Sequence, residues 1–296
     1  MRLLRVGDVD LCVDEYGDRG DPPVLLVHGA AASMDWWDVG FCESIAAGGR
    51  RVIRYDHRDT GRSTTGPAGA PAYDGTALET DVVALVETLD AGPVHLIGLS
   101  MGGGIAQAVA DHRPDLVVAL TLIATSAAGG TDTAALPGVS PELQALFTDP
   151  PPDPDWTDRD AVIGWFTAGE RAYSGRLFDE GRTRAIAGQV FDRSVDPAAA
   201  GNHWLLEGEG DPVDVGRISA PTLVVHGTDD PMFPLPHGEA LAAAISGARL
   251  LVVEGMGHQV PPEPTWGRVV PEILSLQSAA FGPGRTQRAS RHGRGH

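Results

Sequence analysis

The chain has 296 residues, of which 42% are hydrophobic and 21% charged, and its formal net charge at pH 7 is -18. A strongly acidic chain is repelled by nucleic acid and by anionic membranes, so we expect neither as a partner. None of the 22 cationic residues is lysine. This excludes Schiff-base chemistry, pyridoxal phosphate attachment and phosphate loops that depend on a lysine.

The first residues reach an acid, Asp8, before any apolar run of signal-peptide length, and no later stretch approaches the length of a membrane span. We therefore expect a cytoplasmic protein. The two cysteines, Cys12 and Cys42, are too few for a disulfide framework and lack the spacing of metal ligands. We expect them to be small buried hydrophobic residues, and we expect no metal and no cofactor.

The chain begins with strand-like segments. Residues 3–6 and 9–16 predict a hairpin, and the apolar run 24–27 is typical of a strand buried on both faces of a parallel sheet. A loop of small residues follows from His28, where a backbone N–H can approach a ligand closely. We expect the Ala30 N–H to stabilise an oxyanion. We expect His28 to brace the loop, with a role as proton carrier as the alternative.

The next segments continue the alternation of helix and strand. Residues 36–47 predict a helix, residues 52–56 the next strand, and residues 76–90 an amphipathic helix with apolar side chains at helical spacing. The charged turn 57–63 resembles a catalytic cluster at first sight. We expect it instead to shape its loop through local ion pairs and hydrogen bonds.

A nucleophile elbow is predicted at Ser100. The apolar run 94–98 turns through this serine into a helix of small residues. Gly98 and Gly102 flank the turn, and a Cβ at either position would collide with the strand or the helix. The helix N-terminus and the Met101 N–H would favour negative charge, as an oxyanion requires. The alternative is a glycine-rich connection in an ordinary α/β sheet.

After the next strand the alternation breaks, and residues 127–210 predict an inserted helical cap. They contain no comparable strand-like run, yet they hold eight of the 17 aromatic residues of the chain. Such enrichment indicates an apolar roof over a site, and we expect Trp165, Phe166 and Trp204 of the cap to bind the substrate, together with Trp37 of the core. Alternatively, these aromatic side chains pack the cap against the core.

Strand and helix then alternate again through four elements: strand 222–226, helix 237–246, strand 249–254 and helix 264–278. Six strand–helix steps predict an α/β fold with a doubly wound, mostly parallel sheet. We therefore assign residues 1–126 and 211–278 to the core. Residues 279–296 are rich in arginine and predict a disordered tail.

Functional side chains in such a sheet lie at the carboxyl ends of the strands, where Ser100 falls. A serine hydroxyl needs a base to remove its proton and a carboxylate to orient that base. His258 follows the final strand in a glycine-rich loop that can reach the serine, so we expect it to be the base. Asp229 and Asp230 are both candidates for the acid. We prefer Asp230, because it precedes a proline and ends a Gly-x-x-Asp pattern.

These motifs resemble those of the α/β-hydrolase family. The resemblance rests on five segments: His28-Gly29, 56–63, 98–102, 227–230 and Gly257-His258. It implies an α/β-hydrolase fold in which Ser100, Asp230 and His258 are nucleophile, acid and base. It further implies that the N–H groups of Ala30 and Met101 form the oxyanion hole.

Residues 52–65 and 255–261 are especially similar to polyketide esterases of the aclacinomycin methylesterase type. This similarity implies hydrolysis of a small-molecule carboxylic ester, such as a methyl ester or lactone of a bulky apolar or polyketide-like compound. Two alternatives stay open: a cofactor-free perhydrolase, haloperoxidase or C–C bond hydrolase, and a ligand-binding relative without turnover. We expect a monomer or a homodimer.

Overall fold

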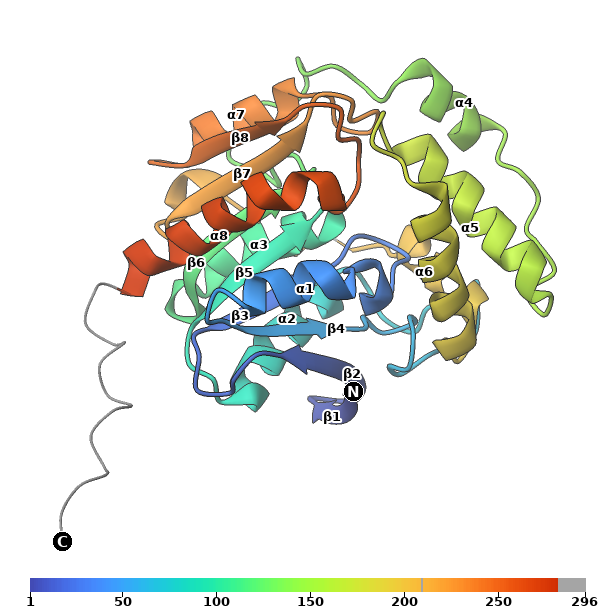
Figure 1. Cartoon of the computed structure of the whole chain (residues 1–296), viewed down its shortest axis with the longest axis horizontal. Helices are drawn as coiled ribbons and strands as arrows, with labels where there is room; N and C mark the ends of the chain where they lie inside the picture. Colours follow the sequence, from blue (N-terminus) through green and yellow to red (C-terminus); the bar gives the residue numbers. More distant parts are fainter. Residues whose placement is uncertain (209, 282–296) are drawn as a thin grey trace, which may run out of the picture.

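The predicted doubly wound sheet is confirmed in the computed structural model, which describes residues 1–208 and 210–281 (Figure 1). One eight-stranded sheet has the order β1-β2-β4-β3-β5-β6-β7-β8. The β1–β2 and β2–β4 pairs are antiparallel, and all other neighbours are parallel. The strands are β1 Arg2–Val6, β2 Val9–Tyr16, β3 Pro23–Val27, β4 Arg51–Tyr55, β5 Val94–Leu99, β6 Val117–Ile123, β7 Thr222–Gly227 and β8 Arg249–Val253.

Helices cover both faces of this sheet (Figure 1). One face carries α1 Val39–Ala46 and α8 Trp266–Phe281, and the other carries α2 Thr76–Leu89, α3 Met101–His112 and α7 Pro236–Ala244. Short 3-10 helices connect several elements: η1 Met34–Trp36, η2 Pro114–Leu116, η3 Pro197–Leu205, η4 Val215–Arg217 and η5 Glu263–Thr265. The sheet is therefore the middle of three layers, as expected for strands buried on both sides.

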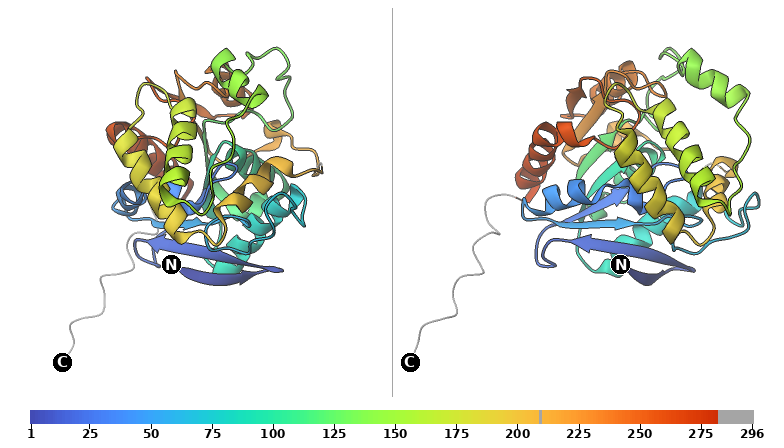
Figure 2. Two further views of the ribbon diagram at one scale, coloured as in Figure 1. Left: turned by 90° about the vertical axis from the view of Figure 1, so that its right-hand side faces the viewer. Right: turned by 45° about the vertical axis from the view of Figure 1, so that its right-hand side comes forward.

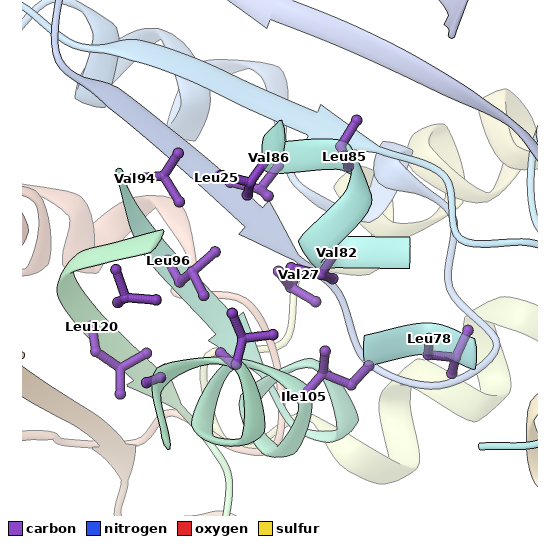
Figure 3. Packing of buried hydrophobic residues seen from close by; sticks show 14 of the residues in the cluster. Leu25, Val27, Leu78, Val82, Leu85, Val86, Val94, Leu96, Ile105 and Leu120 are labelled. Atoms are coloured by element: carbon purple, nitrogen blue, oxygen red, sulfur yellow. The ribbon is translucent and has the colours of Figure 1, made fainter. Parts of the chain in front are cut away.

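The side chains of β3 divide between the two hydrophobic cores. Val24 and Leu26 pack with α1 and α8, whereas Leu25 and Val27 pack with α2 and α3. Figure 3 shows the second of these cores, with Leu25 and Val27 among side chains of α2, α3 and β5. Because successive strand residues face opposite sides, both faces of β3 are buried, and all of its residues are apolar.

The predicted cap segment, residues 127–210, contains the helices α4 Pro141–Thr148, α5 Arg159–Tyr173 and α6 Glu180–Arg193. In both views of Figure 2, α5 and α6 lie side by side, outside the layers that flank the sheet. Aspartates cap the N-termini of two of these helices. The Asp158 carboxylate accepts hydrogen bonds from backbone N–H groups in the first turn of α5, and the Asp179 carboxylate accepts one from the first turn of α6. No strand occurs among the described residues of this segment. The boundaries of the cap remain a prediction.

Two other predictions concern the rest of the chain. Cys12 and Cys42 are buried and form no disulfide, as predicted. The predicted tail, residues 279–296, lies outside the described residues except for its first three positions, which continue α8. None of the helices within the described ranges combines the length and the apolar character that crossing a membrane requires.

Candidate active site

Ser100 lies at the sharp turn between β5 and α3. Its backbone has φ 53° and ψ -121°, a conformation that residues with a Cβ rarely adopt. A Cβ at Gly98 would lie 2.3 Å from the carbonyl oxygen of Gly102, and one at Gly102 would lie 2.2 Å from that of Val27. Both glycines are therefore required by close backbone contacts, as the sequence predicts. The turn holds the Ser100 side chain at the carboxyl end of β5.

The side chains of Ser100, His258 and Asp230 form one hydrogen-bonded chain. Ser100 Oγ lies 2.8 Å from His258 Nε2, and His258 Nδ1 lies 3.1 Å from Asp230 Oδ2. The three residues follow β5, β8 and β7, whose carboxyl ends meet at one edge of the sheet. The His258 backbone N–H also donates to the Tyr173 carbonyl oxygen at 2.8 Å, which links the histidine loop to the end of α5.

The structure brings Asp230, and not Asp229, to the imidazole. Asp230 Oδ1 accepts hydrogen bonds of 2.9 and 2.8 Å from two backbone N–H groups of the following turn. Its second oxygen, Oδ2, thereby points to His258. The neighbouring Asp229 forms an ion pair of 2.7 Å with Arg176 instead, and this hydrogen-bonded pairing lowers the pKa of Asp229.

Ala30 and Met101 both line the pocket beside Ser100. Met101 is the first residue of α3, so its N–H has no acceptor within the helix. On either side of Ala30, the neighbouring N–H groups are bonded to histidine Nδ1 atoms at 2.7 and 2.9 Å, which holds the loop in place. Backbone N–H groups in the same pocket as a serine nucleophile can bind the oxygen of a tetrahedral intermediate, so an oxyanion hole at Ala30 and Met101 stays a prediction.

His28 braces its loop, as expected. Its Nδ1 accepts a hydrogen bond of 2.7 Å from the Gly29 N–H, and its ring packs edge-on against Trp37 at 5.2 Å. Burial lowers the pKa of His28 to about 3, because the charged imidazolium would lose its solvation. The imidazole that contacts Ser100 Oγ is that of His258.

The hydrogen-bonded chain opens into a pocket of about 350 Å³ between the sheet edge and the cap segment. Core residues in its wall are His28, Gly29, Ala30, Ala32, Trp36, Asp38, Leu99, Ser100, Met101, Met232, Phe233, His258, Gln259, Val260, Pro261, Pro262, Glu263 and Trp266. The cap segment contributes Glu170, Tyr173, Ser174, Leu177, Phe178, Asp179, Arg182, Thr183, Ile186 and Trp204. Within the described ranges, no group of three His, Cys, Asp or Glu side chains could hold a metal ion.

Of the four aromatic residues predicted to bind substrate, Trp204 is found in the pocket wall. Trp37 is fully buried in the core, and its neighbour Trp36 lines the pocket instead. Trp165 and Phe166 pack edge-on against each other, with ring centroids 5.5 Å apart, and neither belongs to the lining. The predicted helix over 36–47 begins only at residue 39, so helical periodicity does not describe how the two tryptophans point.

Sequence reasoning missed several residues of the pocket wall, among them Glu170, Tyr173 and Phe233. The rings of Tyr173 and Phe233 pack against the His258 ring at centroid distances of 6.0 and 5.5 Å. Glu170 and Tyr173 are three residues apart in α5 and therefore share a face of the helix. That spacing is visible in the sequence, but nothing in it says which face of α5 lies over Ser100.

Arg182 is the arginine of the described pocket wall. Its guanidinium bonds to Asp38 at 2.7 Å and to Glu263 at 2.5 Å, and it lies 4.9 Å above the ring of Trp266. Two carboxylates and an aromatic face thus share its positive charge. An anionic ligand would have to compete with both carboxylates for this arginine.

Comparison with known proteins agrees with this architecture. A family profile described as the alpha/beta hydrolase fold matches residues 22–263. Rhodomycin D methylesterase DauP of Streptomyces sp. (strain C5) is 30% identical over 285 residues, which cover 88% of this chain and 92% of the relative. A non-heme chloroperoxidase of Streptomyces lividans is 30% identical over 289 residues, 90% of this chain and 94% of the relative. The enol-lactonase structure from Burkholderia xenovorans LB400 is similar with a TM-score of 0.68 at 21% identity, covering 94% of this chain and 100% of that chain.

Proposed function

Because this chain belongs to the alpha/beta hydrolase fold family, we propose that it is a serine hydrolase that cleaves carboxylic esters of small molecules. The observation that carries the proposal is the contact of 2.8 Å between Ser100 Oγ and His258 Nε2. The 30% identity to a rhodomycin D methylesterase supports an ester as the substrate. A pocket of about 350 Å³ with aromatic walls supports a bulky apolar or polyketide-like methyl ester or lactone.

The mechanism begins with attack of Ser100 Oγ on the ester carbonyl carbon. His258 Nε2 takes the hydroxyl proton, and Asp230 stabilises the resulting imidazolium through Nδ1. The carbonyl π electrons move to oxygen, and the N–H groups of Ala30 and Met101 bind the oxyanion. Collapse of this intermediate breaks the C–O bond, and His258 gives its proton to the departing alcohol. An acyl-enzyme on Ser100 remains.

Water completes the cycle. His258 removes a proton from a water molecule, which attacks the acyl carbon and forms a second tetrahedral intermediate in the same oxyanion hole. When this intermediate collapses, the proton returns to Ser100 Oγ and the carboxylic acid leaves. The proposed reaction needs no cofactor, because Ser100 supplies the nucleophile, His258 transfers every proton, and backbone N–H groups bind the oxyanion.

A second candidate is perhydrolysis, which the similarity to a non-heme chloroperoxidase supports. Hydrogen peroxide would then replace water in the second half of the cycle and give a peracid. A C–C bond hydrolase would use the same residues, and a ligand-binding relative would show no multiple turnover. A panel of esters, diketones, and acetate with peroxide distinguishes these outcomes, because only the preferred reaction class reaches ordinary enzyme rates.

The decisive experiment compares the wild type with Ser100→Ala on p-nitrophenyl esters and on labelling by a fluorophosphonate. We expect the variant to lose both ester turnover and labelling, because the nucleophile is removed. Ser275→Ala is the matched control, since Ser275 lies exposed in α8, away from the pocket. Labelling that persists in Ser100→Ala would contradict the proposal. The cytoplasmic location and the monomeric or homodimeric state remain predictions.

A further inference from the structure

Glu170 lies in the pocket wall with Ser100 and His258. It is on α5, one turn before Tyr173, whose carbonyl oxygen accepts the His258 N–H and whose ring packs against the imidazole. Within the described chain, the Glu170 carboxyl group has no hydrogen-bond or ion-pair partner. Its pKa is raised, and burial is the cause. The proposed mechanism gives this carboxyl group no role.

The other carboxyl groups of the wall all have partners. Asp38 and Glu263 bond to the Arg182 guanidinium, and Asp179 accepts the Arg182 backbone N–H at 3.0 Å at the start of α6. Glu170 is therefore the exception among the described carboxyl groups of the pocket. Glu170 is half-buried, and its carboxyl group has no partner within the described chain, so a ligand bound in the pocket can supply the missing interaction.

The surroundings of Glu170 favour a cationic ligand over an anionic one. The described wall holds four carboxyl groups and one arginine, and that arginine is already shared between two of the carboxylates. Burial raises the pKa of Glu170 to about 7, because the apolar wall disfavours its charged form. Tyr173, one turn further along α5, stays uncharged between pH 6 and pH 8, because burial raises the pKa of its phenol.

We propose that Glu170 is a specificity-determining residue that binds a positively charged amine on the ester substrate. The inference rests on the proposed function, because it concerns the same pocket. Direct pairing with a cation would hold the Glu170 carboxyl group ionised, and aromatic rings in the same pocket wall, such as those of Tyr173 and Phe233, also favour a cation. Basic esters would therefore be preferred over neutral esters of equal shape.

The test uses two p-nitrophenyl esters that differ in one atom. The 4-(trimethylammonio)butanoate ester carries a permanent cation, and the 5,5-dimethylhexanoate ester has carbon in place of that nitrogen. For the wild type at pH 8, we expect kcat/KM to be higher for the cationic ester. In Glu170→Gln the ratio of the two kcat/KM values should fall by about tenfold or more, because one directly paired charge is removed.

The pH dependence of the same ratio supplies a readout that a structural role would not change. Between pH 6 and pH 8 Glu170 loses its proton, so the preference of the wild type for the cationic ester should rise across this range. In Glu170→Gln the ratio should not vary with pH. Both esters react through the same Ser100 and His258, and the quaternary ammonium group of the cationic ester does not titrate.

The matched control is Glu180→Gln, which makes the same chemical change at an exposed position outside the pocket wall. It should keep the wild-type ratio. A Glu170→Gln ratio equal to that of the wild type would overturn the inference. If both esters were hydrolysed equally well by the wild type, the inference would fail while the proposed esterase function stood. If neither were hydrolysed and fluorophosphonate did not label Ser100, the proposed function itself would fail.

A measurement on the wild type alone covers the case in which Glu170→Gln does not fold. Choline and 3,3-dimethylbutan-1-ol have the same shape, and only choline is charged. We expect choline to be the stronger competitive inhibitor of ester hydrolysis, by about tenfold at pH 8. Inhibition that is equal for the two compounds, or stronger for the neutral alcohol, would overturn the inference.

Discussion

Arg193, at the end of α6, donates two hydrogen bonds to Asp56, which follows β4 and lies 137 residues earlier in the chain. These bonds measure 2.5 and 2.6 Å, and the same guanidinium also bonds to the carboxylate of Asp35. All three side chains are buried. The cluster therefore connects the helices above the pocket to the sheet below it.

Replacing Arg193 by methionine should lower the free energy of unfolding by about 3–5 kcal/mol, because two buried carboxylates would lose their counter-charge. Urea unfolding followed by circular dichroism at pH 7 measures this loss. The matched control is Arg159→Met, because Arg159 bonds to the exposed Asp192 and joins α5 to α6 at the surface. If Arg159→Met lowered the free energy of unfolding as much as Arg193→Met, burial of the cluster would not be the cause.

Asp230→Asn should lower kcat for ester hydrolysis by about 10⁴-fold, as expected when the imidazole is held in the wrong tautomer. The amide oxygen can still accept the two backbone N–H bonds of the turn, so the fold should be kept. Steady-state kinetics on a p-nitrophenyl ester measures the effect. Asp229→Asn is the control, and it should stay within a few-fold of the wild type, because Asp229 pairs with Arg176 and not with His258. Equal losses in both variants would argue against Asp230 as the acid.

Gly98→Ala should lower both thermal stability and kcat/KM, since its Cβ would lie 2.3 Å from the Gly102 carbonyl oxygen. The Gly102 backbone cannot move aside without shifting Ser100, and a displaced nucleophile costs about 10²-fold in rate. The control is Gly104→Ala in the following helix, α3, where an added Cβ meets nothing within 4 Å. It should raise the free energy of unfolding by about 0.5–1 kcal/mol. Wild-type activity in Gly98→Ala would refute the close-contact argument.

The buried His57 should make the protein less stable in mild acid. Burial lowers the pKa of His57 to about 3, whereas an unfolded histidine titrates near a pKa of about 6.5. Between these values the unfolded state binds more protons, so the free energy of unfolding falls as the pH falls. From pH 7 to pH 5 this residue should account for a loss of roughly 2 kcal/mol.

His57→Gln should therefore show a smaller decline between pH 7 and pH 5 than the wild type, as measured by urea unfolding at both pH values. His112→Gln is an opposing control. The hydrogen bond that His112 Nδ1 donates to the Glu79 carboxylate raises the pKa of His112, so that histidine stabilises the fold at lower pH, and its removal should make the decline steeper. Identical declines in the wild type and His57→Gln would contradict the assignment.

Local sequence patterns were sufficient for the sheet and for the elbow at Ser100. The mainly apolar runs 24–27 and 94–98 predict central parallel strands, because strands buried on both faces of a sheet are nearly continuous apolar runs. The polar side chain of the second run, His95, is buried and hydrogen-bonded to Thr121. Gly98 and Gly102 predict the tight turn for an equally local reason, since close backbone contacts exclude a Cβ. The positions of Asp230 and His258 after later strands follow from the rule that strand ends share one edge of the sheet.

The sequence by itself therefore determined the family and the sheet, because periodicity and turn chemistry act over a few neighbouring positions. It predicted Ser100 and His258, and it preferred Asp230 to Asp229 without excluding the latter. Only the tertiary structure decided which member of an adjacent pair faces the pocket, as with Trp36 in place of Trp37. It also placed Glu170 in the wall without a partner. The direction of a side chain in a cap depends on how whole helices dock, and that docking arises from contacts between residues more than a hundred positions apart, such as Arg193 and Asp56.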